Sequence, residues 1–281
     1  MGQLDFLKPN TLEEAKALIR ENPKSKLLAG GTDLVLELRR NKGNYNCIVS
    51  LDKISELKSI VECEDNIIIG SMVTFNDLIE SSVIRNNYNS LLNCSRTMGS
   101  PQIRNVATVG GNIVNAGSAA DVIPCIISLG GVLIIESSEG IRRVSCENYF
   151  KNYHDEKLED KEILTKIILP KDNYQSGYYK LGKRNSLAIA RISAAITLQR
   201  EENRIKNIKI CLGAVGRYPL RVMELEKKGV NREVQWLFSE EALKYLKYAV
   251  EKSIAGRKTM PFKREAIKGV FKEALTIALK S

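Results

Sequence analysis

Two pairs of adjacent glycines are the residues whose type and spacing could carry chemistry in this chain. The first pair lies in residues 26–33, KLLAGGTD, and the second in residues 105–121, NVATVGGNIVNAGSAAD. Glycine has no Cβ and accepts positive φ, so backbone N–H groups at such turns can approach a ligand closely. Each pair interrupts an apolar, strand-like run. Two such turns can hold one diphosphate from both sides, which is the chemistry of a dinucleotide.

The spacing differs from that of the better known nucleotide loops. A Rossmann unit needs G-x-G-x-x-G between a strand and a helix, and neither glycine pair supplies it. A G-x-x-x-x-G-K skeleton does occur at residues 177–183, but the next residue is Arg184. A phosphate-binding loop requires a Mg²⁺-binding hydroxyl there, so we reject this segment as a signal of nucleoside triphosphate hydrolysis.

The elements expected around the first pair follow a β-α-β order. Residues 26–29 predict a strand, residues 30–32 the turn, and residues 33–40 a short helix with its N-terminal partial positive charge toward the diphosphate. A capping box at residues 11–14 starts an earlier helix, which must end before Pro23. The first glycine pair is therefore expected between a buried strand and a helix start.

The second pair is expected to lead into a helix over residues 121–129 and a strand over residues 132–136. A polar break at residues 170–176 predicts a domain boundary. Beyond it, helical periodicity is found in residues 240–253 and 263–280. The sequence therefore predicts two domains that combine helices and strands.

Composition excludes several classes of protein. The chain has 281 residues, 43% of them hydrophobic, which suits a globular protein of two domains. No apolar run approaches the roughly 20 residues that span a bilayer, and the first residues lack the order of a secretion signal. We therefore expect no membrane insertion and a cytoplasmic protein. The net charge of +10 is spread along the chain among acidic residues, so we expect a solvated basic surface and no nucleic-acid binding.

The cysteines and the histidine argue against a metal site or a catalytic triad in this chain. None of the six cysteines forms a C-x-x-C pair, and buried reduced thiols are the expected state. His154 is the single histidine, in a polar stretch that predicts solvent exposure. The sequence therefore predicts no metal and no catalytic residue here.

A family resemblance rests on KLLAGGTD, on PQIRNVATVGGN at residues 101–112, on Asp121, and on Tyr179-Lys180 followed by Arg184. Over nearly its whole length the chain resembles the FAD-binding medium subunit of the xanthine dehydrogenase and carbon monoxide dehydrogenase group of molybdenum hydroxylases. The resemblance implies an α+β fold. A two-part FAD-binding region of the PCMH, vanillyl-alcohol-oxidase-like type would occupy residues 1–172, in subdomains of about 1–82 and 83–172. A smaller α+β C-terminal domain would occupy residues 173–281.

Matched position by position, the resemblance implies FAD contacts at both glycine pairs and at three later positions. These are Lys26, Leu27, Leu28, Ala29, Gly30, Gly31, Thr32, Asp33, Thr108, Val109, Gly110, Gly111, Asn112, Asp121, Leu164 and Lys180. Two interpretations stay open for some of them. Thr32, Thr108 and Asn112 can cap helices or bind phosphate oxygens. Asp121 can cap a helix or contact a ribose, and Lys180 can lie on the surface or place a cation near the flavin.

The resemblance also implies a role in a complex of several subunits. The chain would pass electrons from 2Fe–2S clusters on a small subunit through FAD to NAD⁺, as in xanthine dehydrogenase. The molybdenum cofactor would reside on a large subunit. Alternatives are a flavin subunit for a nicotinate- or carbon monoxide-type hydroxylase, a stand-alone FAD oxidase or dehydrogenase, and a scaffold with vestigial flavin loops. The intact glycine pairs argue against the scaffold, and the compact region after residue 170, which lacks histidine, argues against the stand-alone enzyme.

Overall fold

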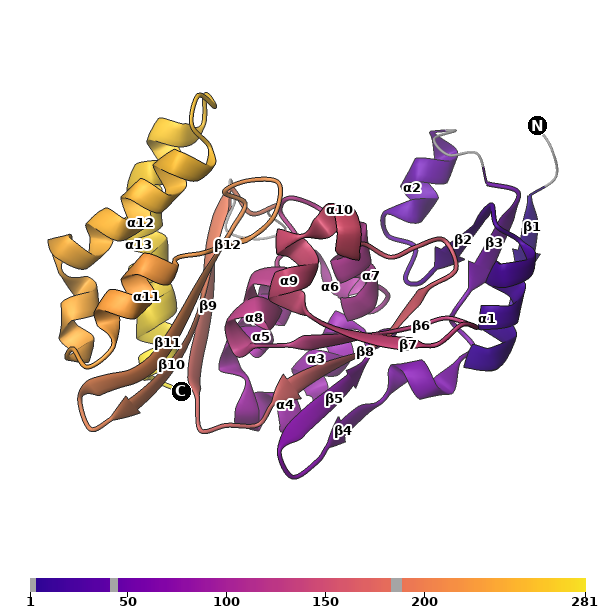
Figure 1. The fold of residues 1–281 in the computed structure, drawn as a ribbon, viewed down its shortest axis with the longest axis horizontal. Coiled ribbons are helices and arrows are strands. Elements are labelled where there is room, and N and C mark those ends of the chain that lie inside the picture. The colour runs from indigo at the N-terminus through magenta and orange to yellow at the C-terminus, as the bar shows by residue number, and fades with distance from the viewer. Residues whose placement is uncertain (1–3, 41–44, 183–188) are drawn as a thin grey trace. The chain divides into compact units, whose positions relative to one another are not determined.

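The computed structural model describes residues 4–40, 45–182 and 189–281, so Arg184 lies outside the described residues. The chain forms two compact units, each assembled from segments that are distant in sequence (Figure 1). The first unit comprises Met1–Asp77, Ser100–Asn115 and Gly131–Pro170. The second unit comprises Leu78–Gly99, Ala116–Gly130 and Lys171–Ser281.

A small parallel sheet carries the first glycine pair. Its strands are β1 (Asp5–Leu7), β3 (Cys47–Ser50) and β2 (Ser25–Leu28), in that order. Helix α1 (Leu12–Glu21) packs its apolar stripe against β3. The predicted cap is present, since the N–H of Glu14 donates to Thr11 Oγ1 at 3.2 Å. The first glycine pair follows β2 directly and precedes α2 (Leu34–Arg39), as predicted.

The second sheet of this unit is antiparallel, with β8 at its centre. In spatial order its strands are β4 (Ile60–Glu62), β5 (Asn66–Gly70), β8 (Ile163–Pro170), β6 (Val132–Glu136) and β7 (Ile141–Ser145). The remaining helices of the unit are η1 (Ser55–Lys58), α6 (Pro101–Arg104), α7 (Val109–Asn115), α9 (Cys146–Lys151) and α10 (Tyr153–Glu156). Helix α3 (Phe75–Glu80) begins in the first unit and continues into the second.

The second glycine pair is not a turn after a strand, which corrects the prediction. Both glycines lie in the first turn of helix α7, and helix α6 precedes it. Val109 and Ile113 are four residues apart and both fully buried, so the apolar spacing here is helical. Between α6 and α7 the chain forms no strand, only an isolated β-bridge from Thr108 to Thr74.

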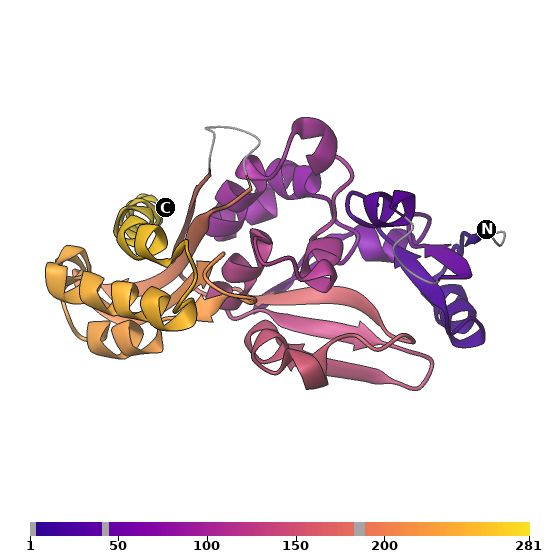
Figure 2. The same ribbon diagram turned by 90° about the horizontal axis from the view of Figure 1, so that it is seen from above.

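The second unit is built on a four-stranded antiparallel sheet. In spatial order the strands are β12 (Leu220–Arg221), β11 (Arg204–Gly213), β10 (Ile192–Glu201) and β9 (Gln175–Leu181). Helices α12 and α13 cover one face and α5 and α8 the other (Figures 1 and 2). The helices of this unit are α4 (Ser82–Asn87), α5 (Asn89–Thr97), α8 (Val122–Leu129), α11 (Met223–Gly229), η2 (Val234–Phe238), α12 (Glu240–Ser253) and α13 (Met260–Leu279).

The six cysteines are free thiols, as expected, and only Cys63 is not buried. Burial raises the pKa of the Cys125 and Cys146 thiols above the ordinary value, so both stay protonated and unreactive. Within the described ranges, we find no group of cysteine, histidine and carboxylate side chains arranged to hold a metal ion. Nor is any helix of those ranges apolar enough over a sufficient length to cross a bilayer.

Candidate functional site

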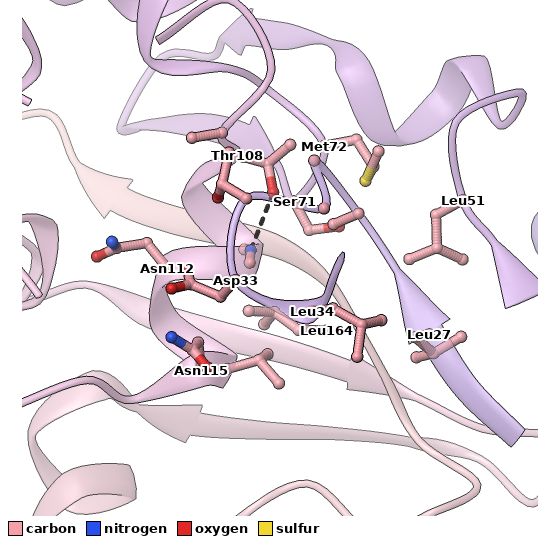
Figure 3. Close-up of a pocket in the computed structure, with 18 of the residues that line it drawn as sticks. Leu27, Asp33, Leu34, Leu51, Ser71, Met72, Thr108, Asn112, Asn115 and Leu164 are labelled. Carbon is pink, nitrogen blue, oxygen red and sulfur yellow. Dashed lines mark hydrogen bonds between the residues drawn. The ribbon is translucent and has the colours of Figure 1, made fainter. Parts of the chain in front are cut away.

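Both glycine pairs border one cavity of about 360 Å³ in the first unit (Figure 3). This volume lies within the roughly 300–1,000 Å³ usual for small-molecule sites. Twelve of the predicted contact residues line it: Lys26, Leu27, Ala29, Gly30, Gly31, Thr32, Asp33, Thr108, Gly110, Gly111, Asn112 and Leu164. The fold therefore brings together two segments that are about 80 positions apart, and Gly30 packs directly against the backbone of Val106.

Leu28 and Val109 are not among the lining residues. The Leu28 side chain lies against the glycine turn, since a Cβ on Gly31 would be 3.3 Å from Leu28 Cδ1. Val109 is fully buried in the core under α7. Their contact with a ligand stays a prediction.

The first glycine turn presents free backbone donors. Gly31 has φ of 73°, the left-handed region that glycine enters without cost. Gly30 packs so closely that a Cβ there would lie 1.8 Å from the carbonyl oxygen of Val106. Among the described residues, the N–H groups of residues 30–33 donate no hydrogen bond to the chain. Four adjacent unbonded donors beside a cavity suit an anion such as a diphosphate.

The second glycine pair has no such donors. The N–H of Gly110 donates to the Ser71 carbonyl at 2.9 Å. The N–H of Gly111 donates to Thr108 Oγ1 at 3.0 Å, dashed in Figure 3. Thr108 thus caps α7, one of the two interpretations that its sequence position left open. Gly110 has no room for a side chain, since a Cβ would lie 2.7 Å from the Ser71 carbonyl oxygen.

The side of the cavity formed by the second pair offers side-chain atoms instead. The Oγ of Ser71 and the Oδ1 of Asn112 are buried and find no hydrogen-bond partner among the described residues. Both residues line the cavity, and in Figure 3 the amides of Asn112 and Asn115 lie across from Leu27 and Leu51. Buried polar atoms without partners are costly, so these positions suit a ligand that supplies the partners. A dinucleotide, with phosphate oxygens and sugar hydroxyls, supplies both kinds.

Sequence reasoning missed eleven lining residues: Leu34, Glu37, Leu51, Ser71, Met72, Ala107, Val114, Asn115, Tyr153, Leu158 and Ile163. Ser71 could have been suspected, because it directly follows a buried strand, where loops carry ligand contacts. Tyr153 and Leu158 could not have been suspected from the sequence, because they lie in a polar stretch. In that stretch His154 is exposed, as predicted.

Asp121 and Lys180 belong to the second unit, where they form a buried ion pair. Tyr178 donates its hydroxyl proton to the other carboxylate oxygen of Asp121 at 2.7 Å. Asp121 stands at the N-cap position of α8 but makes no capping bond with its side chain. The Lys180 side chain is only 7% exposed, so it is not a surface lysine. Burial raises the pKa of Asp121, with Lys180 acting against the rise, and burial raises the pKa of Tyr178 well above its ordinary value.

The fold, the cavity and the two glycine pairs that border it define a class that sequence comparison identifies. Residues 2–172 match the family described as the FAD binding domain in molybdopterin dehydrogenase. Residues 177–278 match the family described as the CO dehydrogenase flavoprotein C-terminal domain. The chain belongs to the FAD-binding subunits of the molybdenum hydroxylase family of oxidoreductases, and the predicted resemblance and fold class are confirmed.

Individual relatives cover from 79% to nearly all of the chain. It is similar to the nicotinate dehydrogenase FAD-subunit of Eubacterium barkeri, with 31% identity over 97% of this chain and 95% of that protein. It is 32% identical to the xanthine dehydrogenase FAD-binding subunit of Escherichia coli O157:H7, over 79% and 77% of the two chains. The structure resembles carbon monoxide dehydrogenase from Hydrogenophaga pseudoflava, with a TM-score of 0.89, 24% identity, and coverage of 99% and 98%.

Proposed function

We propose that FAD binds in the cavity of the first unit, with the two glycine pairs in different roles. The unbonded N–H groups of residues 30–33 hold the diphosphate, and they are the single observation that carries the proposal. Asn112 and Ser71 bond sugar or flavin polar atoms through the side-chain oxygens that lack partners in the protein. The full proposed FAD site is the sixteen residues named from the resemblance, including Leu28, Val109, Leu164, Asp121 and Lys180.

For Asp121 and Lys180 the proposed contact has a specific form. Both carboxylate oxygens of Asp121 already accept hydrogen bonds, from Tyr178 and from Lys180. The ammonium of Lys180 has three donors, of which Asp121 takes one. We therefore propose that the lysine makes the FAD contact and that the aspartate orients it.

We further propose that the chain works in a complex with a large subunit holding the molybdenum cofactor and a small subunit holding 2Fe–2S clusters. When bound, FAD supplies the exchange between one-electron and two-electron transfer, with NAD⁺ as the proposed acceptor. This chain's residues bind and orient the cofactor, and none acts as acid or base. The proposed boundaries are residues 1–172 for the FAD-binding domain and 173–281 for the C-terminal domain, in the cytoplasm.

Two substrates for the complex are proposed. Xanthine is the first, supported by the relative from Escherichia coli O157:H7. Nicotinate is the second, favoured by the match over 97% of this chain to the nicotinate dehydrogenase FAD-subunit. A molybdenum subunit would select between them, because hydroxylation takes place there.

The test is purification of the native complex, with partner subunits identified by mass and NAD⁺ reduction assayed with xanthine and with nicotinate. We expect two partners, reduction with one of the two substrates, and flavin released as FAD on acid precipitation. Oxidation of an organic substrate by the isolated chain would instead indicate a stand-alone enzyme. A chain purified without flavin, and unable to take up FAD, would contradict the proposed binding.

A further inference from the structure

One wall of the cavity is formed by residues 153–162, which supply the lining side chains Tyr153 and Leu158. Within this segment, helix α10 has four residues and buries none of them. So short a helix has no stability of its own, because its nucleation is unfavourable. The position of this wall must therefore be fixed by contacts from neighbouring elements.

Arg142, on strand β7, makes those contacts at both ends of the segment. Its Nε donates to Glu162 Oε1 at 2.7 Å, and its Nη2 to Glu162 Oε2 at 2.8 Å. Its Nη1 donates to Glu156 Oε2 at 3.0 Å, and Nη2 also donates to the Glu156 carbonyl at 3.0 Å. This fork of bonds needs the planar guanidinium, which a lysine cannot imitate.

Helix α9 supports the same segment from behind the lining residues. The backbone N–H of Leu158 donates to the Tyr149 hydroxyl at 3.3 Å. The Tyr153 ring packs edge-on against Tyr149, with centroids 5.7 Å apart, and stacks with Phe150 at 6.1 Å. Helix α9 thus holds the Tyr153 ring and the Leu158 backbone, and both residues also line the cavity.

We propose that Arg142 is a positioning residue for FAD: it fixes residues 153–162 so that Tyr153 and Leu158 cover the adenine ring. This inference rests on the proposed binding of FAD in the cavity. An aromatic and an aliphatic side chain are apt partners for a flat ring. The flavin ring must stay accessible to exchange electrons, whereas adenine needs only a fixed place, so the segment covers adenine.

The test is a double-mutant cycle on the full chain, with Arg142→Gln, Tyr153→Ala and both together. FAD affinity is measured by flavin fluorescence, with ADP as competitor and FMN as a second probe. Arg142→Gln is expected to weaken FAD and ADP about tenfold, because Tyr153 and Leu158 are no longer fixed beside the ligand, and to leave FMN unchanged. The double variant is expected to bind no more weakly than Tyr153→Ala, because the arginine acts through the tyrosine wall.

Two further variants keep the test decisive. Arg143→Gln, the exposed neighbour on β7, is the matched control and should bind FAD as the wild type does. Glu156→Gln replaces a charged acceptor of Arg142 by a neutral amide and should weaken FAD about threefold even if Arg142→Gln fails to fold. Arg142→Lys should bind with intermediate affinity.

Unchanged FAD affinity in Arg142→Gln or Glu156→Gln, or additive losses in the double variant, would overturn the inference. Weaker FMN binding by Arg142→Gln, with ADP affinity unchanged, would overturn it as well, because the segment would then cover the flavin. A wild-type chain that binds neither FAD nor ADP would instead contradict the proposed function.

Discussion

Around Gly31, four consecutive backbone N–H groups donate to no other described residue, whereas around Gly110 and Gly111 the N–H groups are bonded inside the first unit. The same Gly-Gly dipeptide thus has two different structural roles beside one cavity. At the first turn glycine permits the positive φ of Gly31 and exposes donors. In α7 glycine permits close packing against Ser71, and the polar atoms without protein partners in the described structure belong to the side chains of Ser71 and Asn112. A glycine pair indicates a close approach, and only the hydrogen bonds show whether it serves a ligand or the fold.

The second segment continues to Asp121, and the same distinction holds there, because its carboxylate is bonded within the second unit. Polar groups of the first turn are left for a ligand, and those of the second segment mostly stabilise the protein. Substitutions should therefore affect cofactor binding in one region and stability in the other. The predictions below test that difference.

The largest effect is expected for Asp121→Asn. It leaves the ammonium of Lys180 buried without its countercharge, which should lower the free energy of unfolding by about 3 kcal/mol. Urea denaturation of the flavin-free chain measures this decrease in the free energy of unfolding. The control is Asp52→Asn, because the Lys58–Asp52 pair is exposed (side chains 44% and 76%) and should change stability by under about 1 kcal/mol. Equal effects of the two substitutions would show that the buried pair has no special role.

Gly31→Ala should cause the next largest change, a loss of FAD affinity of about 100-fold. A Cβ at φ of 73° is strained, and a shift of the turn breaks charged hydrogen bonds to the diphosphate. Gly111→Ala should cost only about tenfold, since its Cβ would meet the rotatable Thr108 Oγ1 at 2.8 Å. Flavin titration compares them. Gly140 also has positive φ but open space around it, so the control variant Gly140→Ala should bind FAD as the wild type does. Equal losses of FAD affinity in Gly31→Ala and Gly111→Ala would contradict the proposed difference between the two glycine pairs.

Asn112→Ala should weaken FAD about tenfold without lowering the stability of the flavin-free chain. Its Oδ1 has no partner in the described structure, so truncation removes a ligand contact and no protein hydrogen bond. Titration and thermal unfolding of the same samples measure both quantities. Asn112→Asp keeps an acceptor and should bind more tightly than the alanine variant. A drop in stability without a change in affinity would mean that Asn112 serves the fold, as Thr108 does.

The smallest effect concerns Glu162, on the wall that neither glycine pair supplies. Burial would raise its pKa, but hydrogen bonds from Arg142 outweigh this and hold the pKa below the ordinary value. A lowered pKa stabilises the fold above the ordinary carboxyl pKa of about 4.3, and this contribution is lost as the pH falls through the folded value. The difference in unfolding midpoint between wild type and Glu162→Gln should be constant from about pH 8 to 5 and shrink below about pH 4. A difference that grows on acidification would contradict the assignment.

Local sequence determined the elements whose causes are local. The capping box before Leu12 and the helix Glu240–Ser253 follow from side-chain spacing and capping residues a few positions apart. The two glycine pairs, through the family resemblance, also identified a cofactor class. Such patterns survive without tertiary information because the hydrogen bonds that they govern lie within a few residues.

Tertiary structure decided what those residues do. In the second glycine pair, Gly110 serves packing because Ser71, distant in sequence, accepts its N–H bond and leaves no room for a side chain. Asp121 neither caps α8 with its side chain nor stays exposed, because strand β9 brings Lys180 and Tyr178 to it. Tyr153 lines the cavity through contacts with α9, in a stretch whose composition indicates solvent exposure. A residue's role depends on its partners, and partners from other elements are set by the packing of the whole unit.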